Sequence, residues 1–300
     1  MKIFKEFPDQ LPEFKYLNGI ESPKDLKLLE EDQLVDLADE LREFLLHSVS
    51  KTGGHFGAGL GTIELTIALH YVLDMPFDKI VWDTGHQAYP HKILTGRRDK
   101  MHLMRKKDGL HAFPSITESE YDAMSVGHSS TSISASLGMN EANVHLSTKR
   151  NIFSVIGDGA MTAGIAFEGM MHAAHLDNNL NIILNDNDMS ISKNTGGLSD
   201  YLAKVWASKS YKKLKSSGKK VLKNLPGGLH ISRSLKDGLK HAVMPGNLFE
   251  DLGLHYIGPI DGHDIPLLIK TLRRMVEKKE PYLLHIICLL YTSPSPRDRS

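Results

Sequence analysis

The sequence lacks the features that mark several classes of protein. It has one cysteine in 300 residues, which excludes an internal disulfide framework and a zinc site built from cysteines. Lys plus Arg and Asp plus Glu both number 36, so no net charge attracts nucleic acid or an anionic membrane. No apolar run approaches the ~20 residues of a membrane span, and the N-terminus resembles neither a signal peptide nor a transit peptide. We therefore expect a cytoplasmic protein that binds neither nucleic acid nor membranes.

What is present is typical of an α/β protein. Apolar residues make up 41% of the chain and charged residues 24%, as in ordinary soluble globular proteins. Short apolar runs that predict strands alternate with segments of helical periodicity, which favours a parallel sheet flanked by helices. The predicted strands are 80–82, 152–156, 182–184 and 282–287. The predicted helices are 23–49, about 62–73, a segment ending near 145, one starting near 162, and 264–279.

Polar turns follow two of the predicted strands. The run at 152–156 leads into a Gly-Asp-Gly turn around Asp158, and the run at 182–184 into an Asn-Asp-Asn turn that ends at Asn187. Because the carboxyl ends of parallel strands meet at one sheet edge, we expect Asp158 and Asn187 to emerge side by side. A carboxylate, an amide oxygen and the N-terminus of the helix near Thr162 suit Mg²⁺ and phosphate groups. The functional interpretation is a diphosphate held through a metal.

The alternative interpretation of the first turn is structural, because Gly-Asp-Gly is also ordinary turn chemistry. The second turn favours function: the two turns with a helix between them resemble the thiamine diphosphate signature of the transketolase and decarboxylase superfamily. That resemblance implies that Asp158 and Asn187 ligate Mg²⁺ through their side chains, and Met189 through its backbone carbonyl. It also implies that thiamine diphosphate contacts the residues of the two turns: Gly157, Asp158, Gly159, Ala160, Asn187 and Met189.

Three separate glycine turns each carry a histidine, namely His55, His86 and His128. His86 lies where the strand 80–82 leads into a helix, which is where α/β proteins place their ligands. His128 lies in a turn rich in Ser and Thr, whose hydroxyls we expect to cap the helix that ends near His145. A single such histidine is as often merely exposed. Three of them beside a metal–diphosphate site indicate an active site rich in proton donors.

Longer motifs make the resemblance specific. Together they resemble the 1-deoxy-D-xylulose-5-phosphate synthase family, and they occur in that family's order over residues 17–287. GHQAYPHKILTGR and GHSSTSISA distinguish this family from transketolase, its nearest relative. The motifs are SKTGGHFGAGLGTIELTIALHYV, WDTGHQAYPHKILTGR, ESEYDAMSVGHSSTSISASLG, IGDGAMTAGIAFEGM and LNDNDMSIS.

The resemblance implies an activity and a set of site residues. His55, His86 and His128 would be catalytic, and His86, Gly127, His128 and Ser129 would also contact the cofactor. The implied enzyme is a transferase that uses thiamine diphosphate to decarboxylate pyruvate and condense the product with glyceraldehyde 3-phosphate. This is the first step of the non-mevalonate pathway to isoprenoid precursors, which also feeds thiamine and pyridoxal biosynthesis. Members of the family form homodimers.

A basic stretch interrupts the α/β pattern. Residues 204–240 contain eleven Lys or Arg and a single acid, Asp237. One interpretation is a patch that binds nucleic acid or phosphate. We favour a mobile basic loop over about 204–247 instead, because aromatic residues do not alternate with the basic ones as they do in surfaces that bind single strands.

The predicted helix at 264–279 follows a Gly-Pro-Ile-Asp-Gly-His-Asp turn, in which we expect His263 to organise the edge of the domain.

The last residues depart from the family pattern. Residues 288–300 match nothing in the family and look like adaptor or frameshifted sequence, so we place the predicted diphosphate- and Mg-binding domain at 1–287. Family members add a pyrimidine-binding domain and a C-terminal domain, and these carry the glutamate that activates the cofactor and the basic groups that hold the substrate phosphate. Neither is present in this sequence. We expect this chain alone to be inactive.

Two alternatives to the synthase stay open at this point. A transketolase-type ketol transferase would share the metal site but would take ketose phosphates. A non-catalytic module that uses the basic stretch to bind RNA would ignore Mg²⁺ and would lose affinity steeply with salt.

Overall fold

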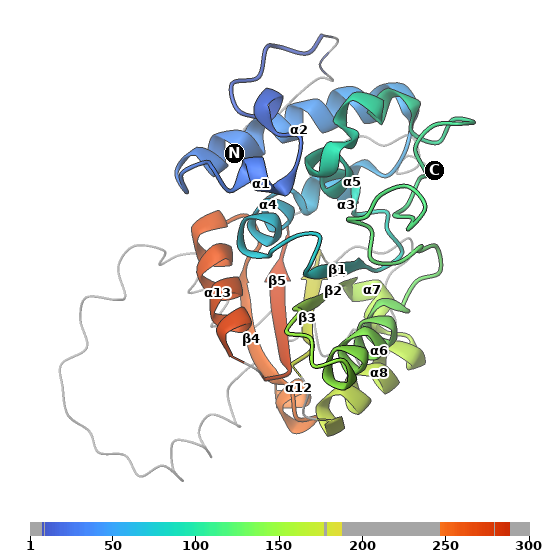
Figure 1. Cartoon of the computed structure of the whole chain (residues 1–300), viewed down its shortest axis with the longest axis vertical. Helices are drawn as coiled ribbons and strands as arrows, with labels where there is room; N and C mark the ends of the chain where they lie inside the picture. Colours follow the sequence, from blue (N-terminus) through green and yellow to red (C-terminus); the bar gives the residue numbers. More distant parts are fainter. Residues whose placement is uncertain (1–7, 9, 177–178, 188–246, 279, 289–300) are drawn as a thin grey trace, which may run out of the picture.

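The computed structural model describes residues 8, 10–176, 179–187, 247–278 and 280–288. Within this part of the chain, five strands form one parallel sheet in the order β1-β2-β3-β5-β4 (Figure 1). This is the α/β architecture that the alternation of strands and helices predicts. The strands are β1 (Lys79–Trp82), β2 (Ile152–Gly157), β3 (Asn181–Asp186), β4 (His255–Asp261) and β5 (Tyr282–Ile287).

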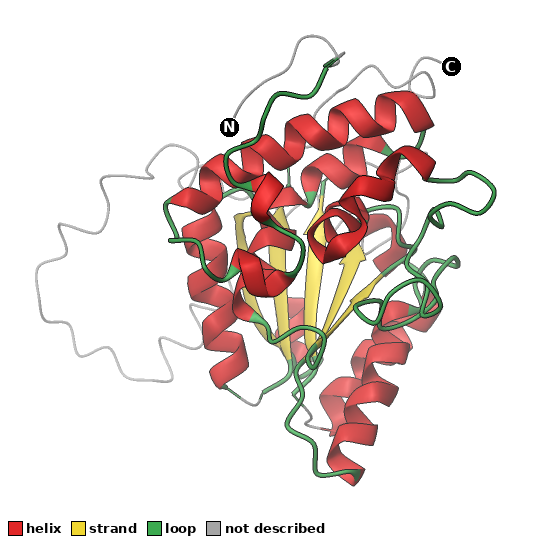
Figure 2. Cartoon of the chain, turned by 45° about the horizontal axis from the view of Figure 1, so that its top comes forward, coloured by secondary structure: helices red, strands yellow, loops and turns green. Residues whose placement is uncertain are grey.

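Strands β1, β2, β3 and β5 are buried because helices cover both faces of the sheet, whereas the edge strand β4 is partly exposed (Figure 2). Side chains alternate between the faces, so neighbours such as Phe153 and Ile152 belong to different cores. The larger core contains Trp82, Phe153 and Leu284 and is covered by α2 (Gln33–Thr52), α4 (Ile63–Val72) and α13 (Ile265–Glu277).

The smaller core lies on the opposite face. It contains Ile156, Leu184 and Leu283, and it is covered by α6 (Ser132–His145), α8 (Gly164–Leu176) and α12 (Asn247–Asp251). Figure 1 shows α6 and α8 packed together on this side, away from α13.

Short elements connect these layers. The chain begins with η1 (Leu17–Gly19) and α1 (Pro23–Leu26), and α3 (Phe56–Gly61) precedes α4. After β1 come α5 (Tyr89–Lys92), the π-helical turn η2 (Ile93–Arg97) and the 3₁₀ segment η3 (Arg98–Leu103). A single turn, α7 (Asp158–Met161), follows β2 directly.

The sequence predicted most of these elements closely. The predicted strand 282–287 matches β5, and the predicted helix 264–279 matches α13. The apolar positions from Leu34 to Val49 in the predicted helix 23–49 are buried in α2. Two predictions were wrong in detail. The helix expected over 23–49 is divided into α1 and α2, and the helix expected from Thr162 is divided because α7 begins at Asp158 and α8 at Gly164. The basic stretch 204–240 lies outside the described residues. No helix among the described residues is long and apolar enough to cross a membrane.

Candidate active site

The tips of β2 and β3 lie side by side at the carboxyl edge of the sheet. The two strands are parallel neighbours, and their register pairs Gly157 with Asn185. Asp158 therefore follows one strand end and Asn187 follows the adjacent one, as the sequence predicted. Asp158 is buried at the start of α7, and Asn187 is half-buried. Met189 lies outside the described residues.

The backbone at the tip of β2 is open to a ligand. Among the described residues, a Cβ atom placed on Gly157 would meet one atom within 4 Å, the carbonyl oxygen of Asn185, at 4.0 Å. A Cβ on Gly127 would meet no atom of the described part of the chain within 4 Å. Gly159 and Ala160 are half-buried within α7, whose amide groups follow the strand end. This edge therefore combines the buried carboxylate of Asp158 with accessible backbone.

A bridge that sequence reasoning missed connects the tips of β2 and β3 to the turn after β1. The amide of Gln87 donates from Nε2 to the carbonyl of Val155 at 3.2 Å, and its Oε1 accepts from Asn185 Nδ2 at 3.0 Å. Gln87 is 2% exposed, and its own carbonyl accepts a hydrogen bond from Thr62 Oγ1 at 2.8 Å. One buried side chain thus fixes the strands of Asp158 and Asn187 relative to each other. The only signal in the sequence was a Gln in a turn after a strand.

The same bridge leaves a polar atom of Asn185 without a hydrogen-bond partner in the described part of the chain. Asn185 is 3% exposed, and its Oδ1 is buried without a hydrogen bond among the described residues. An unpaired buried acceptor costs about 1–3 kcal/mol, so such atoms in native proteins usually face a water, an ion or a ligand.

His55 and His86 come together although they are distant in the sequence. Their rings meet edge to face with centroids 5.6 Å apart. His86 is half-buried, whereas His55 is exposed at the start of α3, and the His55 amide donates to Tyr89 Oη at 3.4 Å. The ring nitrogens of His86 make no hydrogen bond with any described residue, so they are available to a ligand.

The surroundings of His86 keep its ring neutral. Burial lowers the pKa of His86 from 6.5 to about 4; the nearby His55 ring lowers it further, while Asp83 acts in the opposite direction. A neutral imidazole has one nitrogen that donates and one that accepts. At neutral pH this ring can therefore both give and take a proton at a reacting group.

The loop of His128 is anchored to the end of β1. The carboxylate of Asp83 accepts from the amides of Ser130 at 2.7 Å and Ser132 at 3.1 Å. The expectation that local hydroxyls cap α6 was wrong, because the side chain of Thr131 at the N-cap makes no capping hydrogen bond. The carboxylate of Asp83, which is distant in the sequence, accepts from the amides at this helix N-terminus instead. His128 itself is exposed and pairs through Nδ1 with the carbonyl of its neighbour Ser129 at 2.8 Å.

His263 lies beyond this edge, in contact with a buried ion pair. Its Nδ1 is 3.0 Å from Oε2 of Glu64 on α4, and the other oxygen of Glu64 accepts from Arg42 on α2. Burial raises the pKa of Glu64, but the His263 hydrogen bond and the Arg42 charge outweigh it and leave the pKa below its ordinary value. His263 therefore ties the turn after β4 to two helices.

The described residues contain no group of three His, Cys, Asp or Glu side chains arranged to hold a metal ion. A site of this kind would suit transition metals. The predicted Mg²⁺ site needs only one carboxylate, an amide oxygen and a backbone carbonyl, together with oxygens from the ligand and water.

The comparisons with known proteins decide the family. The family model described as 1-deoxy-D-xylulose-5-phosphate synthase matches residues 17–288. The chain belongs to this family. It is 57% identical over 284 residues to the 1-deoxy-D-xylulose-5-phosphate synthase of Pseudomonas entomophila, and 57% identical over the same length to that of Pseudomonas fluorescens Pf-5. Each match covers 95% of this chain and 45% of the relative, so the chain spans about half the length of the curated relatives it matches.

Solved structures share the fold of this family member. Transketolase from Campylobacter jejuni superposes with a TM-score of 0.60 at 17% identity, covering 87% of this chain and 38% of that one. Transketolase from Leishmania mexicana gives 0.61 at 16% identity, covering 85% and 36%. The family match also extends through Cys288, whose side chain is fully buried in the larger core and whose amide donates to the carbonyl of Asp186 at 3.0 Å.

Proposed function

We propose that this chain provides the part of 1-deoxy-D-xylulose-5-phosphate synthase that binds thiamine diphosphate and Mg²⁺. The observation that carries the proposal is the adjacency of the tips of β2 and β3, which brings Asp158 and Asn187 to one sheet edge beside the His55–His86 pair. The complete activity is the decarboxylation of pyruvate and the condensation of the product with glyceraldehyde 3-phosphate.

The residues present fit the cofactor. Asp158 and Asn187 offer the hard oxygen ligands that Mg²⁺ takes, and the unpaired Oδ1 of Asn185 offers a further acceptor close to them. The open face of Gly157 gives a phosphate access to backbone amides. Asp158 and Asn187 would hold the metal by their side chains and Met189 by its carbonyl, while Gly127, Ser129, Gly159 and Ala160 would line the cofactor.

The chemistry divides between the cofactor and the protein. Bound thiamine diphosphate supplies a nucleophilic carbon and an electron sink. This chain's residues bind and orient it, because the bridge through Gln87 fixes the strand tips that hold the metal. His86, neutral at physiological pH, holds or moves a proton at the substrate, and His55 and His128 assist from the rim of the site.

The proposal includes the setting of the enzyme. We place the diphosphate-binding domain at residues 1–287 and take the protein to be a cytoplasmic homodimer in isoprenoid and thiamine precursor synthesis. The nucleic-acid module is disfavoured by the balance of 36 basic and 36 acidic residues.

Cofactor binding by the purified chain tests the proposal directly. Isothermal titration with thiamine diphosphate is expected to show binding only when Mg²⁺ is present. Asp158→Asn removes the carboxylate that we propose as a metal ligand and is expected to weaken this binding at least 100-fold. The matched control is Asp99→Asn, which removes an exposed carboxylate in η3 and is expected to leave affinity unchanged. Equal affinity in wild type and Asp158→Asn would refute the metal site.

Substrate use separates the synthase from a transketolase-type enzyme. A chimaera in which residues 17–288 replace the matching part of the Pseudomonas entomophila relative supplies the remaining length of the family. We expect it to consume pyruvate only when glyceraldehyde 3-phosphate is added. Transfer from a ketose phosphate without pyruvate would favour the transketolase-type activity instead.

A further inference from the structure

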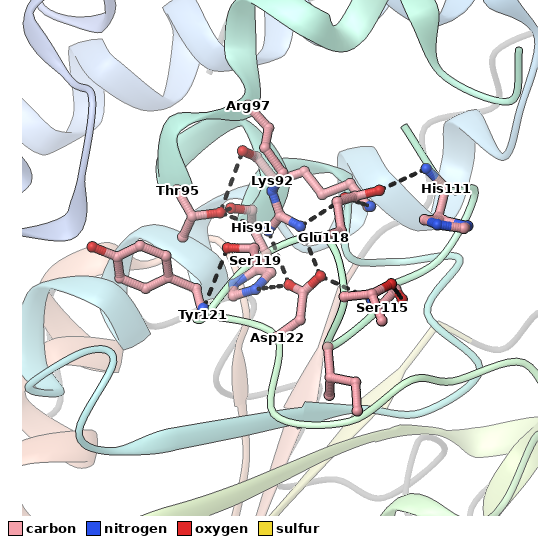
Figure 3. A network of polar contacts seen from close by, with 12 residues as sticks. His91, Lys92, Thr95, Arg97, His111, Ser115, Glu118, Ser119, Tyr121 and Asp122 are labelled. Carbon is pink, nitrogen blue, oxygen red and sulfur yellow. Dashed lines mark hydrogen bonds and ion pairs between the residues drawn. The ribbon is translucent and has the colours of Figure 1, made fainter. Parts of the chain in front are cut away.

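A buried polar network fills the space between α5, η2 and the loop at residues 111–122 (Figure 3). At its centre, both oxygens of the Asp122 carboxylate accept hydrogen bonds. Oδ1 accepts from His91 Nε2 at 3.0 Å and from Arg97 Nη2 at 2.9 Å. Oδ2 accepts from Arg97 Nη1 at 2.7 Å and from the amide of Ser115 at 2.8 Å. The carboxylate is therefore fully satisfied and held from three segments of the chain.

The proton positions in this network follow from its chemistry. Burial raises the pKa of Asp122, but hydrogen bonds from His91 and Arg97 outweigh it and hold the pKa well below its usual range, so this group is a carboxylate. His91 must then donate from Nε2, and because burial lowers its pKa its Nδ1 is a bare acceptor. His70 donates to that atom from Nε2 at 2.9 Å. The network has one tautomer for each ring.

A second carboxylate closes the network. Glu118 accepts from Arg97 Nη1 at 2.8 Å, from the amide of His111 at 2.7 Å, and from Lys92 Nζ. Figure 3 shows Glu118 and Asp122 on either side of the Arg97 guanidinium. The loop is thereby held at both ends against α5 and η2.

The network meets the turn of His86 from two directions. His91 belongs to α5, the helix that follows His86 after two residues. The segment fixed through Ser115 packs on the other side of that turn. A Cβ on Gly85 would lie 2.6 Å from Pro114 Cδ and 2.7 Å from Val126 Cγ2, and Gly85 has a φ of +89°. The amide of Val126 in turn donates to the carbonyl of Pro114 at 3.2 Å.

We propose that Asp122 is a positioning residue that holds the turn of His86 closed, by fixing α5 on one side and residues 113–115 on the other. It acts through the backbone and does not touch the cofactor. The inference rests on the proposed function in that His86 is taken as a group that acts on the substrate. Without Asp122, the wall of the turn, which Pro114 and Val126 form against Gly85, separates from α5. Water then reaches the His86 ring, and the ring loses its orientation toward His55.

The test measures the His86 imidazole itself, independently of any cofactor. In the purified chain labelled with ¹³C at histidine Cε1, NMR titration from pH 8 to 4.5 follows each ring, and His86→Gln identifies the His86 signal. Wild-type His86, which faces His55 and Asp83, is expected to remain mostly neutral throughout. In Asp122→Asn we expect its titration midpoint to rise by at least one pH unit, because the loosened turn hydrates the ring.

Two further variants keep the test decisive. Pro114→Ala leaves Asp122 and its bonds in place but removes part of the wall, and we expect a rise in the same direction and of smaller size; it substitutes for Asp122→Asn if that variant does not fold. The matched control is Asp78→Asn. Asp78 is also buried and accepts from the amides of Asp74 and Asn151, both at 2.8 Å, at the opposite end of β1. The Asp78→Asn variant is expected to have a lower free energy of unfolding and an unchanged titration midpoint of His86.

The outcomes separate this inference from the proposed function. An unchanged His86 midpoint in folded Asp122→Asn and Pro114→Ala would overturn the positioning role, whether or not the chain binds thiamine diphosphate. A similar rise in Asp78→Asn would also overturn it, because the effect would then be general loosening. In the chimaera, Asp122→Asn is expected to lower kcat at least tenfold with cofactor affinity changed less than threefold. Loss of cofactor affinity with kcat preserved would contradict the inference.

Discussion

Two pairs of histidine rings lie close together in the described part of the chain, and their surroundings differ. His70 and His91 stack nearly parallel with centroids 5.0 Å apart, and both are fully buried. His55 and His86 meet edge to face at 5.6 Å, with His55 exposed and His86 half-buried. Burial keeps the pKa of His70, His91 and His86 below the ordinary value in each case. Neutrality alone therefore does not mark a catalytic histidine.

What separates the pairs is where their hydrogen bonds go. Both nitrogens of His91 bond to protein groups, namely Asp122 and His70, whereas the ring of His86 bonds to none of the described residues. A ring whose donor and acceptor are both used by the fold contributes to stability. The His86 ring loses water contacts on burial, and no hydrogen bond to a described residue compensates this cost. An uncompensated cost of this kind is expected at a functional site.

The largest expected difference between the pairs is in stability. His91→Leu removes one hydrogen-bond donor from the Asp122 carboxylate and leaves the Nε2 donor of His70 without an acceptor inside the protein. We therefore expect it to lower the free energy of unfolding by about 3 kcal/mol. His86→Leu removes no hydrogen bond to a described residue, and we expect a change below about 1 kcal/mol at pH 7.5. Urea unfolding of both variants measures this.

A surface control calibrates that measurement. His102 lies on η3 and pairs with the carbonyl of Asp99 at 2.8 Å in an exposed position. His102→Leu is expected to change stability by about 0.5 kcal/mol or less. If His86→Leu proved as destabilising as His91→Leu, the distinction between a structural and a functional pair would fail.

The second prediction concerns pH and uses the lowered pKa of His86. An unfolded chain binds a histidine proton near pH 6.5, whereas folded His86 binds it near pH 4. Between these values the unfolded state holds more protons, so stability is complete above pH 6.5 and is lost as the pH falls toward 4. His86 alone lowers the free energy of unfolding by about 2 kcal/mol at pH 5. His70 and His91, whose pKa values are also lowered, act in the same direction.

Replacing His86 isolates its share of the acid sensitivity. His86→Gln is expected to reduce the loss of stability between pH 7.5 and pH 5 by about 2 kcal/mol, measured by urea unfolding at both values. His70 and His91 remain in this variant, so their share of the loss of stability on acidification is expected to remain. An identical pH dependence in the variant would mean that His86 titrates normally in the folded chain.

The sequence predicted the ends of the strands well because their signals are local. Apolar runs that stop at polar turns identified the tips carrying Asp158 and Asn187, and the parallel arrangement placed them together. Glycine turns pointed to His55 and His86 in the same way. These features depend on short segments, so a single sequence contains them.

The contacts that support the site depend on residues distant in the sequence. Asn185 and Gln87 are 98 residues apart, and Ser132 and Asp83 are 49 apart. Asp122 lies in a loop whose Ser, Glu and Tyr residues are typical of a solvated surface, although its side chain is fully buried. No local pattern distinguishes such a carboxylate from an exposed one, because its partners are chosen by the fold.

A smaller effect than that of His91→Leu is expected from His70, the other member of the buried pair. Its Nδ1 is buried with no hydrogen bond among the described residues, while its Nε2 donates to His91. His70→Phe keeps the stacked ring and removes the unpaired acceptor, but it leaves Nδ1 of His91 without a donor. One unpaired atom replaces another of similar cost, so we expect stability to change by about 1 kcal/mol or less. A loss as large as that of His91→Leu would show that the bond between the rings, rather than the bond to Asp122, fixes the buried pair.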